Sequence, residues 1–206
     1  NIYEGEIIKD HLNNNNIKNV TVINSCAVTA EAEKKVAYEI RKAKRNNPEN
    51  KIIVTGCAAQ INPKKYDSIK EVDLVLGNKE KLISNVWSNL NFTQTIQVQD
   101  ILLEKKTVPT SIEKFDGKSR AYIEIQQGCD HRCTFCIIPY GRGNNRSVPA
   151  GEIIERIKKI VFNGYKEVVL TGVDITDYGK DLPGQPTFSN LIKRIIKLVP
   201  DLEQLR

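Results

Sequence analysis

Hydrophobic positions in residues 1–90 alternate between short continuous runs and longer amphipathic stretches. The continuous runs, rich in Val, Ile and Leu, cover residues 20–23, 52–55 and 74–76. Runs of this kind are typical of parallel strands that are buried on both faces. Apolar residues recur at helical spacing in 7–12, 31–45 and 79–90, and Pro63 opens a further short helix. This alternation predicts a parallel α/β sheet, since parallel strands need crossover connections.

Two single residues in these helices carry a local prediction. Thr29 stands just before the stretch 31–45, and Glu31 and Glu33 fall in its first turn. A Thr hydroxyl can accept a hydrogen bond from a free N–H group at the start of a helix, and carboxylates there are favourable. We therefore expect Thr29 to be the N-cap. His11 is expected to be a solvated helix residue.

The pattern changes after residue 90. Residues 91–119 are mostly polar, contain Pro109 and Gly117 and show no sustained helical period. A second α/β series follows, with strands expected at 121–126 and 167–171 and helices at 151–162 and 189–199. The chain is therefore predicted to have an N-terminal domain (1–92), a linker (93–118) and the start of a second domain (119–206).

Composition limits the classes of protein that need to be considered. The chain has 206 residues, 40% of them hydrophobic and 27% charged, and no apolar run approaches the roughly 20 residues of a membrane span. Its five cysteines are an odd number without disulfide-framework spacing, which favours metal ligation in a reducing, cytoplasmic setting. The net charge of +6 is spread along the chain and is mild evidence for a nucleic-acid partner. The chain begins at Asn1 and contains no Met, so we expect it to be an internal piece of a longer protein, truncated at both ends.

Three cysteines lie together as Cys129-x3-Cys133-x2-Cys136, without a fourth nearby. Structural zinc sites and electron-transfer clusters normally use four protein ligands, whereas three thiolates suit a [4Fe–4S] cluster with one iron open to a substrate or cofactor. His131 could complete a zinc set, but it is too close in sequence to two of the cysteines for unstrained ligation. We therefore interpret the loop as the site of an open [4Fe–4S] cluster.

The other two cysteines follow predicted strands. Cys26 comes three residues after the run 20–23, and Cys57 comes two residues after 52–55. In open parallel sheets, ligands gather beyond the carboxyl ends of the strands. Either cysteine alone would fit a buried apolar position, but their matching placement favours a shared site, which needs at least one more ligand.

These motifs resemble the methylthiotransferase family of radical S-adenosylmethionine (SAM) enzymes. The resemblance is carried by residues 125–147 (IQQGCDHRCTFCIIPYGRGNNRS), 24–29 (NSCAVT) and 56–57 (GC). It implies a flavodoxin-like N-terminal domain for an auxiliary [4Fe–4S] cluster, then the first units of a partial (β/α) radical SAM barrel. Cys26 and Cys57 match the second and third auxiliary-cluster cysteines. The first is expected before Asn1, and an RNA-binding domain after Arg206, so this chain alone is expected to be inactive.

The resemblance also implies the cofactors and partners. Cys129, Cys133 and Cys136 would hold the radical-forming cluster, whose open iron binds SAM, and Phe135 would pack near the SAM adenine. An electron from a donor such as a flavodoxin or ferredoxin would cleave SAM to a 5′-deoxyadenosyl radical. The auxiliary cluster would carry the sulfur that is methylated and inserted into the substrate.

The substrate interpretation depends on a shorter segment. Residues 170–179 (LTGVDITDYG) and 140–143 (YGRG) resemble the group that acts on N6-threonylcarbamoyladenosine at position 37 of tRNA. Asp174 lies at the carboxyl end of a predicted strand, where barrel active sites gather, although a turn or helix cap would also fit. Arg142 and Arg146 are candidates for RNA phosphate contacts, or for a solvated basic loop. The alternatives are methylthiolation of isopentenyladenosine-37 or of a ribosomal-protein aspartate, and a non-catalytic zinc or iron–sulfur module.

Overall fold

The computed structural model describes residues 2–110, 112, 115 and 117–206, and the chain divides into two compact units. One unit combines Ile8–Glu104 with His131–Gly143. The other combines the residues up to Ile7 with Lys105–Asp130 and Asn144–Arg206. Each unit is thus assembled from separate stretches of sequence, and each is described by itself below.

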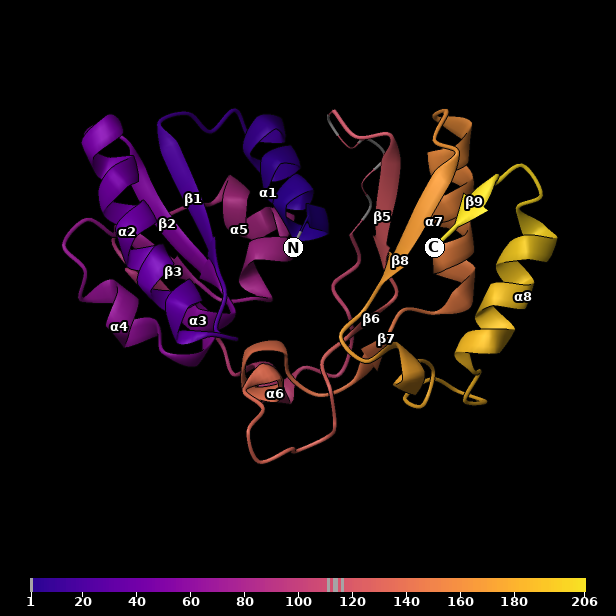
Figure 1. The fold of residues 1–206 in the computed structure, drawn as a ribbon. Coiled ribbons are helices and arrows are strands. Elements are labelled where there is room, and N and C mark those ends of the chain that lie inside the picture. Colours follow the sequence, from indigo (N-terminus) through magenta and orange to yellow (C-terminus); the bar gives the residue numbers. More distant parts are fainter. Residues whose placement is uncertain (1, 111, 113–114, 116) are drawn as a thin grey trace. The chain divides into compact units, whose positions relative to one another are not determined.

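The first unit is built on a four-stranded parallel sheet in the order β1-β2-β3-β4, and we call it the β1–β4 unit (Figure 1). The strands are β1 (Val20–Ser25), β2 (Lys51–Gly56), β3 (Leu74–Leu76) and β4 (Ile96–Gln97). The helical elements that accompany them are α1 (Ile2–Asn14, from Ile8 onward), α2 (Ala30–Asn46), α3 (Cys57–Ile61), α4 (Pro63–Asp67), η1 (Glu80–Leu82), α5 (Ser84–Ser88), η2 (Ile101–Leu103) and α6 (Ile138–Arg142). The parallel strands predicted from the hydrophobic runs are therefore confirmed.

Both faces of this sheet are covered by apolar side chains. Ile52 and Val54 pack with Ile40 of α2 on one face, whereas Ile53 packs with Trp87 of α5 on the other. Successive side chains of a strand point to opposite faces, so a strand covered on both sides must be apolar at every position. This explains the uninterrupted apolar run 52–54 at the centre of β2.

Of three predictions made for the helices, the structure confirms one and corrects two. Thr29 is the N-cap of α2, as predicted, and its Oγ1 accepts from Ala32 N at 3.1 Å. The continuous helix predicted over 79–90 is wrong, because extended backbone at Ile83 separates η1 from α5. His11 is not simply solvated, since its ring stacks on Trp87 with ring centroids 6.2 Å apart.

The stretch predicted as a linker contains regular structure. β4 lies within it and pairs with β3, and η2 follows four residues later. β4 has only two residues, Ile96 and Gln97, which are too few to give a strand signal in the sequence. Its strand conformation is therefore specified by pairing with β3. Residues 111, 113, 114 and 116 of the stretch lie outside the described part of the chain. The boundaries at 92/93 and 118/119 stay predictions.

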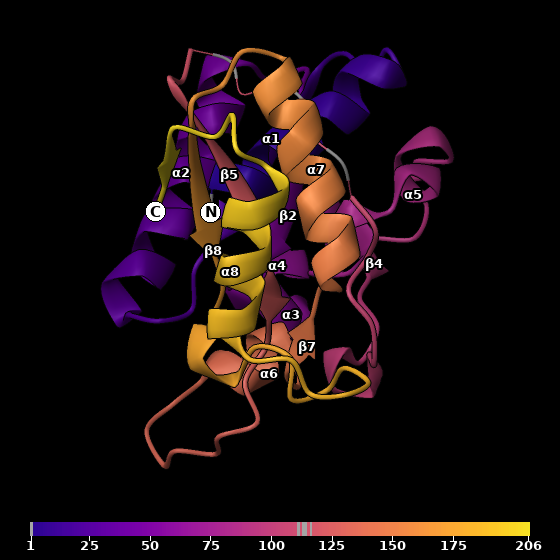
Figure 2. The ribbon, with the colours of Figure 1, turned by 90° about the vertical axis from the view of Figure 1, so that its right-hand side faces the viewer.

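The second unit contains a three-stranded parallel sheet in the order β5-β8-β9 and a small antiparallel pair β6-β7, and we call it the β5–β9 unit. Its elements are β5 (Arg120–Glu124), β6 (Gln126–Gln127), β7 (Arg146–Ser147), α7 (Ala150–Phe162), β8 (Glu167–Thr171), η3 (Ile175–Asp177), α8 (Phe188–Leu198) and β9 (Gln204–Leu205). Helices α7 and α8 lie side by side against this sheet (Figure 2). Strand, helix and parallel strand follow one another twice, which confirms the predicted α/β class with successive βα units.

Across the described residues, none of the helices has the length and apolar character that crossing a bilayer requires.

Candidate functional site

The register of β1 and β2 fixes the positions of Cys26 and Cys57. Ser25 is paired with Gly56 at the carboxyl ends of the two parallel strands. Cys26 directly follows Ser25, and Cys57 directly follows Gly56. Neighbouring strands lie about 4.8 Å apart. The two thiol-bearing residues therefore leave the sheet at equivalent positions, Cys26 exposed and Cys57 partly buried.

A tight turn carries the chain from β2 into α3 at Cys57. Gly56 has φ 98°, and a Cβ atom there would lie 2.2 Å from the carbonyl oxygen of Ser25. Only glycine adopts this backbone without strain and fits the space. Ser25 supports the turn, because its Oγ donates to Thr55 O at 2.5 Å and accepts from Ala59 N at 3.1 Å.

Hydrogen-bond donors from two other segments surround the Cys57 sulfur. Arg142 Nε donates to Cys57 Sγ at 3.1 Å, and Asn78 Nδ2 lies 3.6 Å from the same sulfur. Asn78 Nδ2 also donates to the carbonyl oxygen of Gly141 at 2.5 Å. Gly141 lies so close that a Cβ atom would be 2.9 Å from Cys57 Cβ. A charged guanidinium and an amide N–H therefore converge on this one sulfur.

A buried lysine supports Asn78. Lys81 is 0% exposed, and its Nζ donates to Asn78 Oδ1 at 2.7 Å and to Asn24 Oδ1 at 3.3 Å. Asn24 precedes Cys26 by two residues, and Asn78 follows β3. Beside Lys81, burial raises the pKa of the Glu80 carboxyl above its ordinary value. Polar groups thus gather at the carboxyl ends of β1 and β3.

The three-cysteine loop is divided between the two units. Cys129 belongs to the β5–β9 unit, whereas Cys133 and Cys136 belong to the β1–β4 unit. Cys136 N donates to Cys133 O at 2.9 Å, which closes a turn between these two cysteines. None of the three cysteines forms a disulfide, and Phe135 beside Cys136 is 89% exposed. The loop therefore offers accessible sulfur and an exposed aromatic side chain.

In the β5–β9 unit, Gln126 binds the backbone just before Cys129 and the backbone at Asp174. It is 0% exposed, and its Oε1 accepts from Val173 N and Asp174 N, both at 2.8 Å. Its Nε2 donates to Gly128 O at 2.7 Å, one residue before Cys129. Cys129 Sγ in turn lies 3.7 Å from Asp174 Oδ2. The structure thus brings Asp174 beside the first cysteine of the loop.

The two arginines predicted to contact RNA are held inside the protein to different extents. Arg142 is partly buried and contacts Cys57, as described above. Arg146 is 4% exposed, lies in β7 and donates from Nη1 to Asn144 O at 3.0 Å. Their contact with RNA stays a prediction.

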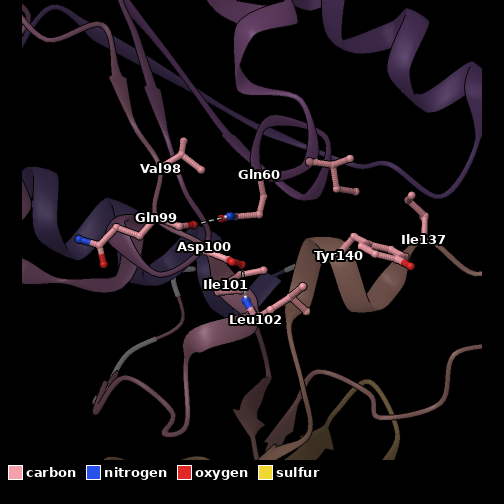
Figure 3. A pocket seen from close by; sticks show the side chains of 9 residues that line it. Gln60, Val98, Gln99, Asp100, Ile101, Leu102, Ile137 and Tyr140 are labelled. Atoms are coloured by element: carbon pink, nitrogen blue, oxygen red, sulfur yellow. Dashed lines mark hydrogen bonds between the residues drawn. The ribbon is translucent and has the colours of Figure 1, made fainter.

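Helix α6 also lines a pocket of about 510 Å³ in the β1–β4 unit (Figure 3). Ile137 and Tyr140 lie on one side of it, opposite the segment Val98–Leu102, with Gln60 between them. The Gln60 Nε2 atom donates to Gln99 O at 2.8 Å and so ties α3 to that segment. Asp100 is the single charged side chain among the residues that line the pocket. No cysteine is among the described residues that line this pocket, in contrast to the ends of β1 and β2.

Sequence reasoning missed Asn78, Lys81 and Gln126. Asn78 closely follows β3, so the rule that singled out Cys26 and Cys57 could have found it, whereas Gln126 lies within the strand expected at 121–126 and the rule would have passed over it. Nothing in the local sequence marks Lys81, because a lysine is expected to be exposed unless the fold supplies partners.

Comparison with known proteins accounts for both halves of the chain. Residues 1–77 match a family described as "Uncharacterized protein family UPF0004", and residues 123–203 match the Radical SAM superfamily. The fold agrees: the radical SAM methyltransferase TsrM of Kitasatospora setae, with a tryptophan substrate and a SAM analogue bound, superposes with a TM-score of 0.54 at 9% identity, over 95% of this chain and 44% of TsrM. The chain is therefore of the class that places a UPF0004 domain before a radical SAM domain.

Sequence relatives narrow this class. The threonylcarbamoyladenosine tRNA methylthiotransferase MtaB of Rickettsia prowazekii is 55% identical over 206 residues, which are 100% of this chain and 48% of that protein. MtaB of Bacillus subtilis is 37% identical over 91% of the chain and 42% of the relative. A tRNA-2-methylthio-N(6)-dimethylallyladenosine synthase of Desulfotalea psychrophila is 31% identical over 100% of the chain and 51% of the relative. The chain is thus similar along its whole length to radical SAM methylthiotransferases that act on tRNA, and it spans about half the length of these relatives.

Proposed function

We propose that the protein catalyses the SAM-dependent methylthiolation of C2 of N6-threonylcarbamoyladenosine at position 37 of tRNA. The observation that carries the proposal is the 55% identity, along the whole chain, to a relative named for this substrate. The two sets of thiols fit the same chemistry, because radical formation and sulfur delivery need separate metal centres.

The donor sets fit iron–sulfur clusters. None of the five cysteines forms a disulfide, and Cys57 already accepts hydrogen bonds of the kind that cluster-bound thiolates receive. We propose that Cys129, Cys133 and Cys136 hold the radical-forming [4Fe–4S] cluster and that Cys26 and Cys57 contribute to an auxiliary one. When bound, these clusters supply the electron that cleaves SAM and the site from which sulfur is delivered.

The remaining roles belong to the side chains of this chain. Phe135, with its ring exposed, would pack against the SAM adenine. Gln126 would hold the backbone at Gly128 and Asp174, so that the first cysteine and the Asp174 carboxylate keep a fixed relation. Asp174 would face SAM or the substrate. Arg146 would contact RNA phosphate, whereas Arg142, which the sequence also suggested for this role, contacts Cys57 instead.

The proposal includes partners and boundaries. SAM and tRNA are the substrates, a flavodoxin or ferredoxin supplies electrons, and the protein works in the cytoplasm away from membranes. Residues 1–92 form the auxiliary-cluster domain, 93–118 connect it, and 119–206 begin the radical SAM domain.

The test is a comparison of two tRNA substrates with the anaerobically reconstituted full-length protein. One tRNA carries N6-threonylcarbamoyladenosine and the other isopentenyladenosine, both without the methylthio group. We expect methylthiolated nucleoside from the first alone, detected by mass spectrometry, and tRNA affinity that falls as salt rises. Product from the second alone would overturn the substrate assignment, and methylthiolated ribosomal protein instead would overturn tRNA modification.

A further inference from the structure

The cysteine loop that holds one proposed cluster continues into a segment that touches a ligand of the other. After Cys133 and Cys136 the chain forms α6 within the β1–β4 unit, and α6 packs against α3, which begins at Cys57. The contact is close, because glycine at position 141 is what allows the α6 backbone to reach Cys57.

Arg142 ends this helix with its guanidinium on the Cys57 sulfur. The Nε–Sγ distance of 3.1 Å is short for a hydrogen bond to sulfur. Arg142 and Cys57 are separated by 85 positions in sequence, so the contact is made by tertiary folding alone. A guanidinium is permanently charged and gives up its hydration more readily than an ammonium, which suits a partly buried contact with a thiolate.

Asn78 holds the same arrangement from the other side. Its amide joins Cys57 Sγ to the carbonyl oxygen of Gly141, and its Oδ1 is held by the buried Lys81. The carbonyl of Gly141 and the guanidinium of Arg142 are on neighbouring residues. Asn78 therefore fixes the end of α6 that presents Arg142 to the sulfur.

We propose that Arg142, held by Asn78, is a positioning residue for the Cys57 thiolate of the auxiliary cluster, so that the segment after the radical-SAM cysteines completes the surroundings of the second metal centre. This rests on the proposed function for the identity of the cluster. Hydrogen bonds and positive charge at a cluster thiolate stabilise the reduced, more negative state, and so raise the reduction potential. The role differs from the RNA contact that the sequence predicts for Arg142.

The test isolates the auxiliary cluster. The parent is the full-length protein in which Cys129, Cys133 and Cys136 are all replaced by Ala, which leaves one cluster to load. Into it are placed Arg142→Gln, Arg142→Lys and Asn78→Ala. Arg45→Gln is the matched control, since Arg45 is an exposed arginine in the last turn of α2 in the same unit. Iron content, the EPR-monitored reduction potential, the thermal midpoint and tRNA affinity are measured for each.

Arg142→Gln is expected to shift the potential to a more negative value, or to lose the auxiliary iron while the thermal midpoint stays at the parent value. Asn78→Ala should shift it in the same direction. Arg142→Lys, which keeps the charge, should shift the reduction potential less than Arg142→Gln. If Arg142→Gln does not fold, the potential of Arg142→Lys tests the role of Arg142. Arg45→Gln should leave the potential unchanged, and tRNA affinity should be unaltered in all variants.

Two results would overturn the inference. One is a cluster in Arg142→Gln with the parent's iron content, potential and EPR spectrum. The other is weaker tRNA binding with an unchanged potential, which would return Arg142 to a phosphate contact. A parent that loads no iron at all contradicts the assignment of the auxiliary cluster itself, so failure of the proposed function is distinguished from failure of the role of Arg142.

Discussion

Ser25 and Gly56 face each other at the last paired position of β1 and β2, and a Cβ atom on Gly56 would lie 2.2 Å from the Ser25 carbonyl oxygen. This single relationship places Cys26 and Cys57, the next residues, at equivalent ends of adjacent strands. The close approach of the two backbones is therefore part of how the candidate site is built, as well as part of the sheet.

The first prediction concerns Gly56. Gly56→Ala should destabilise the protein by about 3 kcal/mol, because the residue would combine left-handed backbone with a clash against Ser25. Urea unfolding followed by circular dichroism measures the change. Gly151→Ala is the matched control: Gly151 lies in α7 with nothing within 4 Å of an added Cβ, so the change should stabilise by about 0.5–1 kcal/mol. Equal stability of the two variants would contradict the packing described here.

The second prediction separates the two proposed clusters. In the full-length protein, Cys26→Ala and Cys57→Ala should abolish the methylthiolated product while reductive cleavage of SAM to 5′-deoxyadenosine persists, because radical formation needs only the cysteine loop. Replacing Cys129, Cys133 and Cys136 together should abolish both. Chromatography of SAM products and tRNA nucleosides provides the measurement. Retained product in Cys57→Ala would make that cysteine a packing residue.

The third prediction concerns the polar core around Cys129. Gln126→Met keeps the volume of the side chain but leaves the N–H groups of Val173 and Asp174 and the carbonyl of Gly128 without their partner. Buried groups left unsatisfied cost about 1–3 kcal/mol each, so a total loss of about 3 kcal/mol or more is expected in urea unfolding. The exposed Gln204→Met should stay within about 0.5 kcal/mol of the parent. A neutral Gln126→Met would show that Gln126 does not hold this backbone.

The fourth prediction is a pH dependence at Asp73. Burial acts to raise the pKa of this carboxyl, but hydrogen bonds from Lys51 Nζ and Ile52 N, with the charges of Lys51 and Lys44, outweigh it and lower the pKa below its ordinary value of 3.8. A carboxyl with a lowered pKa in the folded state stabilises the protein above its ordinary pKa, and the contribution is lost as pH falls through the folded value. Asp73 thus stabilises at neutral pH and stops doing so in strong acid.

The measurement for Asp73 is the free energy of unfolding of Asp73→Asn against pH. The variant should be less stable than the parent by about 1.5–3 kcal/mol at neutral pH, since hydrogen bonds to a charged group are lost. The difference should shrink as pH falls below the ordinary pKa. The exposed Asp201→Asn should follow the parent throughout. A difference independent of pH would contradict the role of the Asp73 charge.

Much of the fold was open to prediction from sequence because its signals are local. A strand that is apolar at every position, such as Ile52–Val54 in β2, reports that both of its faces are covered. Thr29 reports the start of α2 because a cap bonds within its own turn. The signal failed where elements are short, as at β4, or where a turn interrupts a periodic stretch, as at Ile83.

For the candidate site, the sequence by itself determined the three thiols of one loop and the placement of Cys26 and Cys57 after strands, since both follow from spacing along the chain. Only the tertiary structure decided that Arg142 reaches Cys57 and that Asn78 joins Cys57 to Gly141, across 85 and 63 positions. The physical reason is that spacing constrains neighbours in a segment, whereas contacts between segments depend on strand order and on which backbones approach closely. The same reason explains Lys81: its charge predicted solvent, and the fold buried it by supplying the oxygens of Asn24 and Asn78.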